Sequence, residues 1–203
     1  AVNADIRRTG SAAAPLALTA SAGAVTINDA SGSIAAIGGN AFNVTIQAGS
    51  GGIALGGAVN TSGGALTLTT TGSGTQVAAF SAGALMLNGT GGAYTLTNTA
   101  NNFASLTGST GSISVADMTA LSVGPVTTTG GLSVTSGGAL TVDGAVLVGG
   151  GSTSLLRSTA GDVTVNATVR KSSGATSSIQ LTASNRVSVN TGISSLGGVF
   201  DTA

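Results

Sequence analysis

Ser62-Gly63-Gly64-Ala65-Leu66-Thr67-Leu68 contains the pattern that decides the fold of this chain. It places a hydroxyl residue, two glycines and a small residue before a triplet in which a hydroxyl residue separates two apolar residues. Successive side chains of a β-strand point to opposite faces, so the triplet puts two apolar side chains on one face and a hydroxyl group on the other. The stretch therefore predicts a short strand that follows a glycine-containing turn.

The same pattern recurs along the chain, so the sequence is a repeat. Close copies stand at 21–27, 81–87 and 136–142, and looser copies stand at 109–115 and 159–165. Shorter triplets without the full lead-in lie between them, at 16–18, 44–46, 53–55, 94–96, 121–123, 132–134, 179–181 and 187–189. A repeat of short units that cannot bury an apolar face alone is typical of a solenoid.

Stacking these units gives the predicted architecture. Matching apolar positions, such as Leu66 and Leu85 or Ile113 and Leu132, are 19 residues apart. We therefore predict an all-β, right-handed parallel β-helix (β-solenoid) of about ten coils, each of roughly 19–28 residues with short strands. We expect residues 1–203 to form a single β-solenoid segment, which is part of a longer chain or of an end-to-end assembly.

The turn residues agree with this prediction. Several triplets end directly in Asn or Asp, namely Asn28, Asn88, Asp143, Asn166 and Asn190. Such residues tolerate the left-handed backbone conformation and can hydrogen-bond their own backbone, so we expect them at sharp corners. The glycines before the triplets are expected to form the corner on the other side.

The composition excludes several classes of protein. Hydrophobic residues make up 41% of the chain but aromatic residues only 2%, which disfavours a β-sandwich with aromatic core anchors. Six Lys and Arg balance six Asp, and without a basic cluster we expect no binding of nucleic acid or anionic lipid. Because the chain has no Cys, it can form neither a disulfide nor a thiolate metal site.

A carbohydrate-active β-helix would need converging carboxylates. Asp143 and Asp162 are 19 residues apart, about one coil, and form the best candidate pair. However, Asp143 follows its triplet whereas Asp162 precedes its own, so we expect them at opposite ends of the strand. No His is present to activate a Ser. We therefore expect no enzyme activity, no catalytic residue, no cofactor and no metal site.

Charged and glycine-rich stretches are explained most simply as surface features. Five charged residues lie near the C-terminus: Arg157, Asp162, Arg170, Lys171 and Arg186. We expect solvated loop charges there, with an Asp162–Arg pair between coils, and a partner or glycan contact is the alternative. We expect Arg7-Arg8 to be an exposed loop pair, or a contact to whatever precedes it. The glycine-rich stretches 49–52 and 149–151 match no phosphate-binding pattern and are predicted turns.

Threonine and phenylalanine residues raise two further hypotheses. Thr67, Thr69–Thr71 and Thr127–Thr129 could build a flat array of the kind that ice-binding solenoids use. Their outward positions do not repeat in strict register, which disfavours such an array. Phe42, Phe80 and Phe103 are expected to fill the core or its ends.

Residues 3–6, 14–20, 23–28, 56–68 and 101–103 carry a resemblance to a known family. They resemble the repeat regions of filamentous-haemagglutinin-like exoproteins, the large adhesins of two-partner secretion, and the resemblance covers nearly the whole chain. It implies a right-handed β-helix, a secreted or surface location in Gram-negative bacteria, and a role in adhesion, biofilm or toxin delivery. The family's N-terminal secretion domain is not recognisable in this chain. Autotransporter passengers share the same solenoid.

The resemblance and the residues together lead to a functional expectation. We expect a structural or adhesive β-helical rod, secreted or on the bacterial outer surface, that mediates cell adhesion or biofilm and matrix contacts. Its expected partners are glycans or proteins of host or neighbouring cells, and an outer-membrane transporter during secretion. One alternative is an extracellular filament or matrix subunit that stacks solenoid ends, because repeat-like sequence reaches Ala1 and Ala203 without an obvious cap. A polysaccharide-active or ice-binding β-helix is the other alternative.

Overall fold

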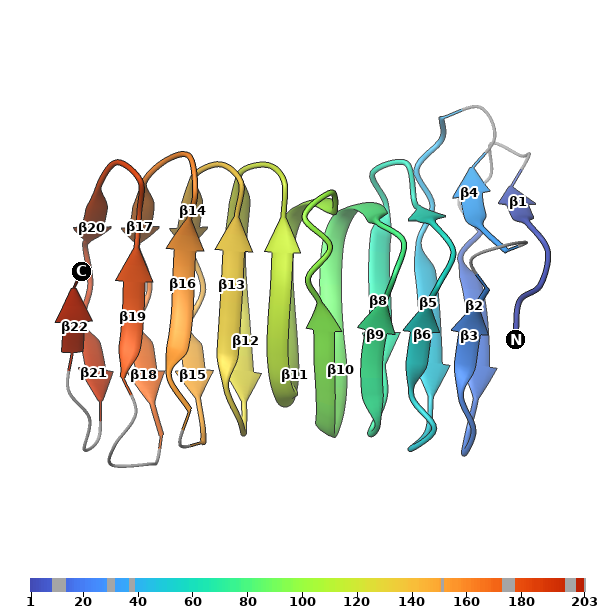
Figure 1. The fold of residues 1–203 in the computed structure, drawn as a ribbon, viewed down its shortest axis with the longest axis horizontal. Helices are drawn as coiled ribbons and strands as arrows, with labels where there is room; N and C mark the ends of the chain where they lie inside the picture. Colours follow the sequence, from blue (N-terminus) through green and yellow to red (C-terminus); the bar gives the residue numbers. More distant parts are fainter. Residues whose placement is uncertain are drawn as a thin grey trace.

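The computed structural model describes the chain except residues 9–13, 29–31, 37–38, 151, 173–177, 196–199 and 203. Its regular elements are all strands, and they pair in parallel along one continuous stack, shown in Figure 1. The predicted all-β, right-handed parallel β-solenoid is thus confirmed. Within the described ranges no helix is long and apolar enough to cross a membrane.

The N-terminal half is built from three columns of strands, one strand of each column per coil. The first column contains β1 (Ile6–Arg8), β4 (Ile34–Ala36) and β7 (Val59–Asn60). The second contains β2 (Leu16–Ala20), β5 (Val44–Ala48) and β8 (Ala65–Thr69). The third contains β3 (Val25–Ile27), β6 (Ile53–Leu55) and β9 (Ser73–Gln76).

Two long strands form the middle of the solenoid. They are β10 (Phe80–Leu96), of 17 residues, and β11 (Asn102–Asp117), of 16 residues. β10 pairs in turn with β7, β8 and β9, so a single strand passes through all three columns. The prediction of short strands is wrong here, because backbone pairing continues around the bends. The one register shift between β10 and β11 lies between Gly89 and Ala93.

The columns are rearranged in the C-terminal half. The first column ends at β11. The second column divides into two at β12 (Leu121–Thr128), because the first half of β12 pairs with β14 (Leu140–Val142) and the second half pairs with β15 (Val146–Val148). These two columns continue through β17 (Val163–Val165) and β20 (Val187–Val189), and through β18 (Val169–Lys171) and β21 (Ile193–Ser195). The third column continues through β13 (Leu132–Ser136), β16 (Ser154–Ser158), β19 (Ile179–Thr182) and β22 (Phe200–Thr202).

Two buried side chains finish the first column where no further strand follows. Asp117 accepts the backbone N–H of Phe103 at 2.8 Å with Oδ1, and both the N–H and the hydroxyl of Thr119 with Oδ2. Asn101 accepts the N–H of Phe80 with Oδ1 and donates to the carbonyls of Leu96 and Ala116. These side chains take over hydrogen bonds at an edge that would otherwise be buried and unpaired.

Coil length follows the strand pairings. Paired residues are separated by as many as 28 positions, as for Ile6 and Ile34, and by as few as 17, as for Ser105 and Ser122. The predicted range of 19–28 residues is therefore right except at the β11–β12 pairing, where losing the first column shortens the coil. The chain makes slightly fewer turns than the ten that we expected.

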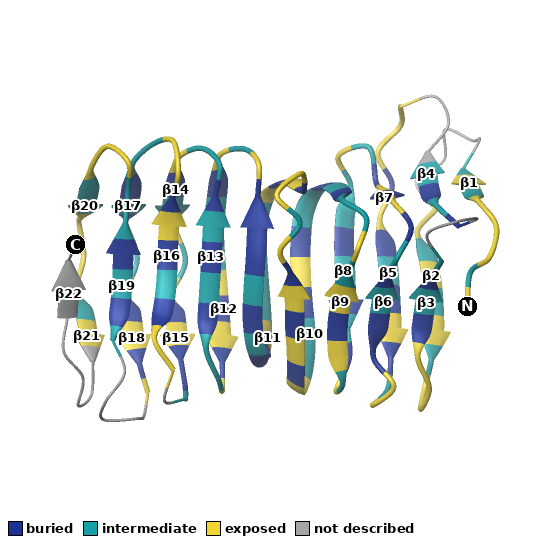
Figure 2. Ribbon diagram, in the orientation of Figure 1, coloured by how far each residue is buried: buried dark blue, intermediate teal, exposed yellow. Residues whose placement is uncertain are grey.

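The core is a set of apolar ladders inside the stack. The triplets predicted from the sequence lie in strands, and their outer two residues are buried or partly buried except for Val189, as in Val44, Leu66 and Leu85 of the second column. Figure 2 shows buried residues recurring along the strands from coil to coil. Phe42, Phe80 and Phe103 are buried, and the rings of Phe80 and Phe103 stack with centroids 5.4 Å apart, which confirms them as core residues.

Four of the five predicted corner residues lie directly after a strand, and one does not. Asn28, Asp143, Asn166 and Asn190 follow strands, whereas Asn88 lies inside β10 and pairs with Thr69 and Ser109. Among the described residues, Ser62 is the only non-glycine residue with positive φ, so none of these Asn and Asp residues adopts the left-handed conformation that they tolerate. The corner side chains instead bond to the neighbouring coil, because an identical corner lies one coil away.

Candidate functional site

A straight row of hydroxyl groups runs along one outer face of the C-terminal half. Ser105, Ser122, Thr141, Thr164 and Ser188 lie on successive strands and pair with one another in strict register. Successive coils stack at about 4.8 Å, so the hydroxyl groups recur at about that interval. We call these five residues the hydroxyl row.

A second row lies two residues further along the same strands. The Asn166 amide donates to Asp143 Oδ1 at 2.9 Å, and the Asn190 amide donates to Asn166 Oδ1 at 2.8 Å. The Ser122 hydroxyl donates to Asp143 Oδ2 at 2.9 Å and so links this row to the hydroxyl row. We call Asp143, Asn166 and Asn190 the amide row, and both rows together the polar face.

A shallow hollow of about 260 Å³ lies at the end of the polar face near the loss of the first column. Its lining consists of Ala104, Ala120, Leu121, Ser122, Ala139, Thr141 and Asp143. This lining offers hydroxyl groups and a single carboxylate that is already hydrogen-bonded. It can accept and donate hydrogen bonds, but it does not bring together an acid and a base.

The two candidate carboxylates do not meet. Leu140 pairs with Val163, which places Asp162 beside Ala139 and puts Asp143 at the other end of the strand, as predicted. Asp162 accepts hydrogen bonds from Asn185 at 2.6 Å and from Arg186 at 3.3 Å. The predicted Asp162–Arg pair between coils is thus confirmed. The Arg186 side chain is 70% exposed, so this ion pair contributes roughly 0–1 kcal/mol.

The charges near the C-terminus form no common patch. Arg157 lies on β16 in the third column, Arg170 lies on β18, and Arg186 precedes β20. Arg157 and Arg170 are strand residues, so the prediction of loop charges is wrong for them. It is also wrong for Lys171, which pairs with Val148 and points into the core at 1% exposure. Burial lowers the pKa of the Lys171 amine.

Arg7 and Arg8 are also not the exposed loop pair that we expected, since both belong to β1. Arg7 points outward and forms an ion pair with Asp5, whose pKa is lowered first by the hydrogen bond from Ser33 and then by Arg7. The Arg8 guanidinium lies 5.8 Å from the centroid of the Phe42 ring and donates to the Ala41 carbonyl.

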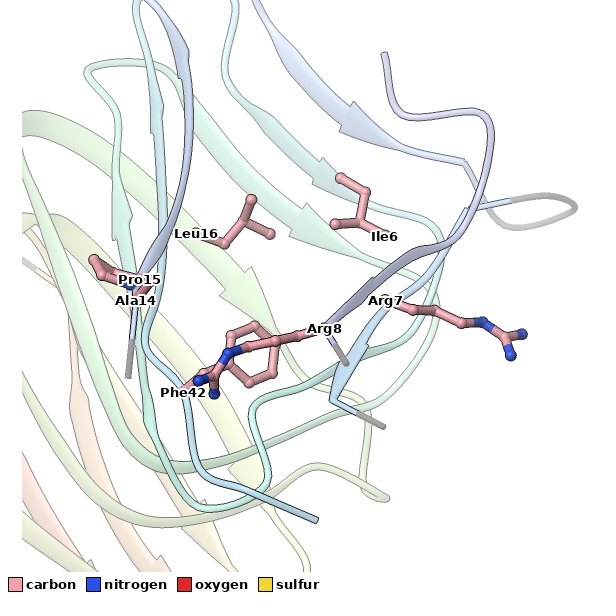
Figure 3. Close-up of a pocket in the computed structure, with 7 residues that line it drawn as sticks. All are labelled: Ile6, Arg7, Arg8, Ala14, Pro15, Leu16 and Phe42. Carbon is pink, nitrogen blue, oxygen red and sulfur yellow. The ribbon is translucent and has the colours of Figure 1, made fainter. Parts of the chain in front are cut away.

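Figure 3 shows the hollow beside Arg8, of about 260 Å³. Ile6, Arg7, Arg8, Ala14, Pro15, Leu16 and Phe42 line it, and Arg7 points away from it. The lining is apolar apart from the two arginines and carries no carboxylate, hydroxyl or imidazole side chain. It therefore offers no nucleophile and no general base.

The threonines singled out in the sequence form no array, as expected. Thr67 pairs with Thr45 and with Met86, and Thr127 pairs with Ser109 and with Leu147. Thr70 and Thr128 are buried and donate to backbone carbonyls of Gly49 and Gly130. Sequence reasoning missed the hydroxyl row, although the middle positions of the aligned triplets carried its signal.

The remaining sequence predictions concern turns and metals. Residues 49–52 connect β5 to β6 and form the predicted turn, as do Gly149 and Gly150 after β15, while Gly151 lies outside the described residues. Within the described part of the chain, no three His, Cys, Asp or Glu residues gather to hold a metal ion.

Comparison with known families identifies the family of this repeat. Two copies of a repeat described as Repeats of unknown function (DUF5649) match residues 41–110 and 110–179, from just before β5 into β19. No curated protein and no solved structure matches the chain. The two matches together cover more than half of the 203 residues and include the long strands β10 and β11. The chain therefore belongs to the family of Repeats of unknown function (DUF5649).

Proposed function

We propose that this chain is a structural or adhesive segment of an extracellular β-helical rod. The observation that supports this best is the uncharged polar face, in which hydroxyl and amide groups line successive coils of a continuous parallel stack. A continuous stack is stiff along its axis, because each coil is hydrogen-bonded to the next. Such a rod can hold binding segments away from a cell and can contact neutral partners along its side.

The proposed partners are glycans or proteins of host or neighbouring cells. Hydroxyl and amide side chains exchange hydrogen bonds with the hydroxyl groups of a sugar and with a protein backbone. The rows also lack the clustered cations that binding to an anionic polymer would use. The resemblance to filamentous-haemagglutinin-like exoproteins supports a secreted or bacterial-surface location and export through an outer-membrane transporter. No catalysis is proposed, since neither hollow described above brings an acid and a base together.

Adhesion of beads coated with the 203-residue chain tests this function. We expect saturable binding to cells or to a panel of immobilised neutral and acidic glycans. Binding through uncharged rows should change little between 50 mM and 500 mM salt, because screening acts on charges. Replacing Thr141 and Thr164 by Val removes two hydroxyl groups of the row at nearly constant shape and should weaken binding.

Matched controls make the outcome decisive. Thr75→Val and Thr95→Val remove paired outward hydroxyls from the third column and should leave binding unchanged. Absence of binding to every surface would contradict the adhesive role. Release of reducing or unsaturated sugar from a polysaccharide panel would contradict the non-enzymatic role. Concentration-dependent growth of long particles in sedimentation would favour a filament subunit instead.

A further inference from the structure

The polar face has a regular repeat along the axis of the solenoid. The hydroxyl row lies on β11, β12, β14, β17 and β20, and the last three of these strands lie side by side in Figure 1. The pairing of the strands holds the hydroxyl groups one coil apart, at about 4.8 Å. A ligand that uses the whole row must therefore be straight and must present hydrogen-bonding groups at nearly the same interval.

The amide row is held in a fixed arrangement by its own hydrogen bonds. Asn190 donates to Asn166, and Asn166 donates to Asp143. Each of these bonds uses one N–H of an amide group that carries two. The row is thus ordered before a ligand arrives, which lowers the entropy cost of binding.

Apolar groups border the hydroxyl row on the side opposite the amide row. Ala120 and Ala139 are exposed, and each lies two residues before a hydroxyl residue of the row. Both alanines line the hollow of about 260 Å³, together with Ser122, Thr141 and Asp143. The surface therefore offers methyl, hydroxyl and carboxylate or amide groups side by side. A pyranose ring matches this arrangement, because its C–H face is apolar and its rim carries hydroxyl groups.

The charges at the polar face are carboxylates, of which one is paired. Asp143 accepts hydrogen bonds within the two rows, and Asp162, which lies beside Ala139, forms an ion pair with Arg186. The hydroxyl groups of a neutral sugar can donate to such carboxylates, and hydrogen bonds to an ionised acceptor are the stronger ones. Asp143 would instead repel an anionic glycan. The face is therefore complementary in charge to a neutral glycan.

We propose that the polar face binds a neutral, unbranched glycan of β-1,4-linked pyranoses that runs along the solenoid axis, with one sugar beside each coil. The inference rests on the adhesive function proposed above and names the ligand of the same face. Equatorial 1,4 linkages give an extended ribbon in which each sugar advances by close to one coil spacing, so successive sugars stay beside successive coils along the row. The hollow has room for one ring at the end of the chain. An α-1,4-linked chain curves away from a straight row.

Calorimetric titration of the 203-residue chain with three hexasaccharides of glucose tests the linkage. Cellohexaose is β-1,4-linked, maltohexaose is α-1,4-linked and laminarihexaose is β-1,3-linked, so composition and size are the same. We expect cellohexaose to bind at least about tenfold more tightly than the other two. From cellobiose to cellohexaose, each added sugar should raise the affinity about two- to tenfold until the row is filled, as expected for about one hydrogen bond gained per sugar.

Substitutions on the face locate the ligand. Thr141→Val and Thr164→Val each remove one hydroxyl group and should weaken cellohexaose binding about two- to tenfold. Thr75→Val changes an outward hydroxyl residue of the third column and should leave this binding unchanged. Asp143→Asn keeps a hydrogen-bonding side chain in the amide row and removes its charge. This variant should bind a hexasaccharide of β-1,4-linked mannuronate more tightly than the parent does.

The outcomes separate this inference from the function on which it rests. Equal affinities for cellohexaose and maltohexaose, or cellohexaose binding that survives both Thr→Val substitutions, would overturn the inference. Adhesion of coated beads to cells without any binding of cellohexaose would also overturn it, and would leave the adhesive function intact. Absence of adhesion to every surface would contradict both.

Discussion

Single residues decide how closely successive coils approach. Gly89 has φ +121°, and a Cβ built on it would lie 1.9 Å from the carbonyl oxygen of Thr70 on the preceding coil. Neither the backbone conformation nor the space accepts a side chain there. Gly23, by contrast, is an exposed turn residue, and a Cβ added to it would meet no atom within 4 Å.

We expect Gly89→Ala to destabilise the chain by about 2–4 kcal/mol, since strain in φ and a backbone clash add. Gly23→Ala should change stability by less than about 1 kcal/mol and serves as the control. Urea denaturation followed by circular dichroism measures both. Equal midpoints for the two variants would show that the coils can separate at Gly89 without cost.

Asp117 ends the first column through hydrogen bonds to two backbone N–H groups and one hydroxyl. Asp117→Ala leaves buried donors without an acceptor and should cost about 2–4 kcal/mol. Asp143→Ala removes an exposed carboxylate and should cost about 1 kcal/mol or less. Hydrogen exchange should show faster loss of the Phe103 amide in the Asp117 variant alone. Unchanged exchange at Phe103 would mean that Asp117 does not protect this edge.

Lys171 gives the chain a pH-dependent stability. Burial lowers its pKa in the folded state below the unfolded value of about 10.4, so the unfolded chain binds the proton more tightly. Stability is therefore reduced below the folded-state pKa and rises as the pH increases from that pKa towards the unfolded value.

Urea midpoints between about pH 7 and pH 10 test this dependence on Lys171. The midpoint should rise as the pH approaches the unfolded-state pKa of about 10.4, and Lys171→Met should be flat over this range. Measurements stop there because burial raises the pKa of Tyr94 to about 12, which lowers stability as the pH rises from about 10 to 12. A flat parent profile would contradict the assignment.

At the scale of the strand, one face of β10 is buried in the core and the other faces the solvent. Leu85 is fully buried between Leu66 and Leu106, whereas its neighbour Met86 points outward and is 42% exposed. Leu85→Ala should cost about 2–5 kcal/mol, because it removes contacts with both neighbouring coils and leaves a cavity. Met86→Ala should cost less than about 1 kcal/mol. Similar costs for both would place the strand in another register.

The strands also show where sequence reasoning ends. A triplet with two apolar residues predicts a strand and its inward face, and the structure confirms this for the triplets of β2, β3, β5, β6 and β8. Some strands were missed, such as β15 and β18. β15 has the apolar–outward–apolar pattern with Leu147 in the middle, whereas β18 has the inward Lys171 as its third residue in place of an apolar one.

At the scale of the whole molecule, stability should vary along the stack. Each coil contacts only its neighbours, so local stability depends on how many sides are paired. β10 pairs with the coils on both sides, whereas β2 pairs, among the described residues, only with β5 and its inward residues are partly buried. Hydrogen exchange of the 203-residue chain should therefore be slower in β10 than in β2. Uniform exchange along the chain would indicate a single cooperative unit instead.

The sequence alone determined the fold class, the inward and outward positions of the triplets and nearly the whole range of coil lengths. It could do so because strand alternation and the repeat are local features that survive variation in the turns. Only the tertiary structure decided the register between coils, since a slip of one residue moves every side chain to the other face. That register aligned the hydroxyl row, ended the first column at Asp117, and turned Lys171 inward.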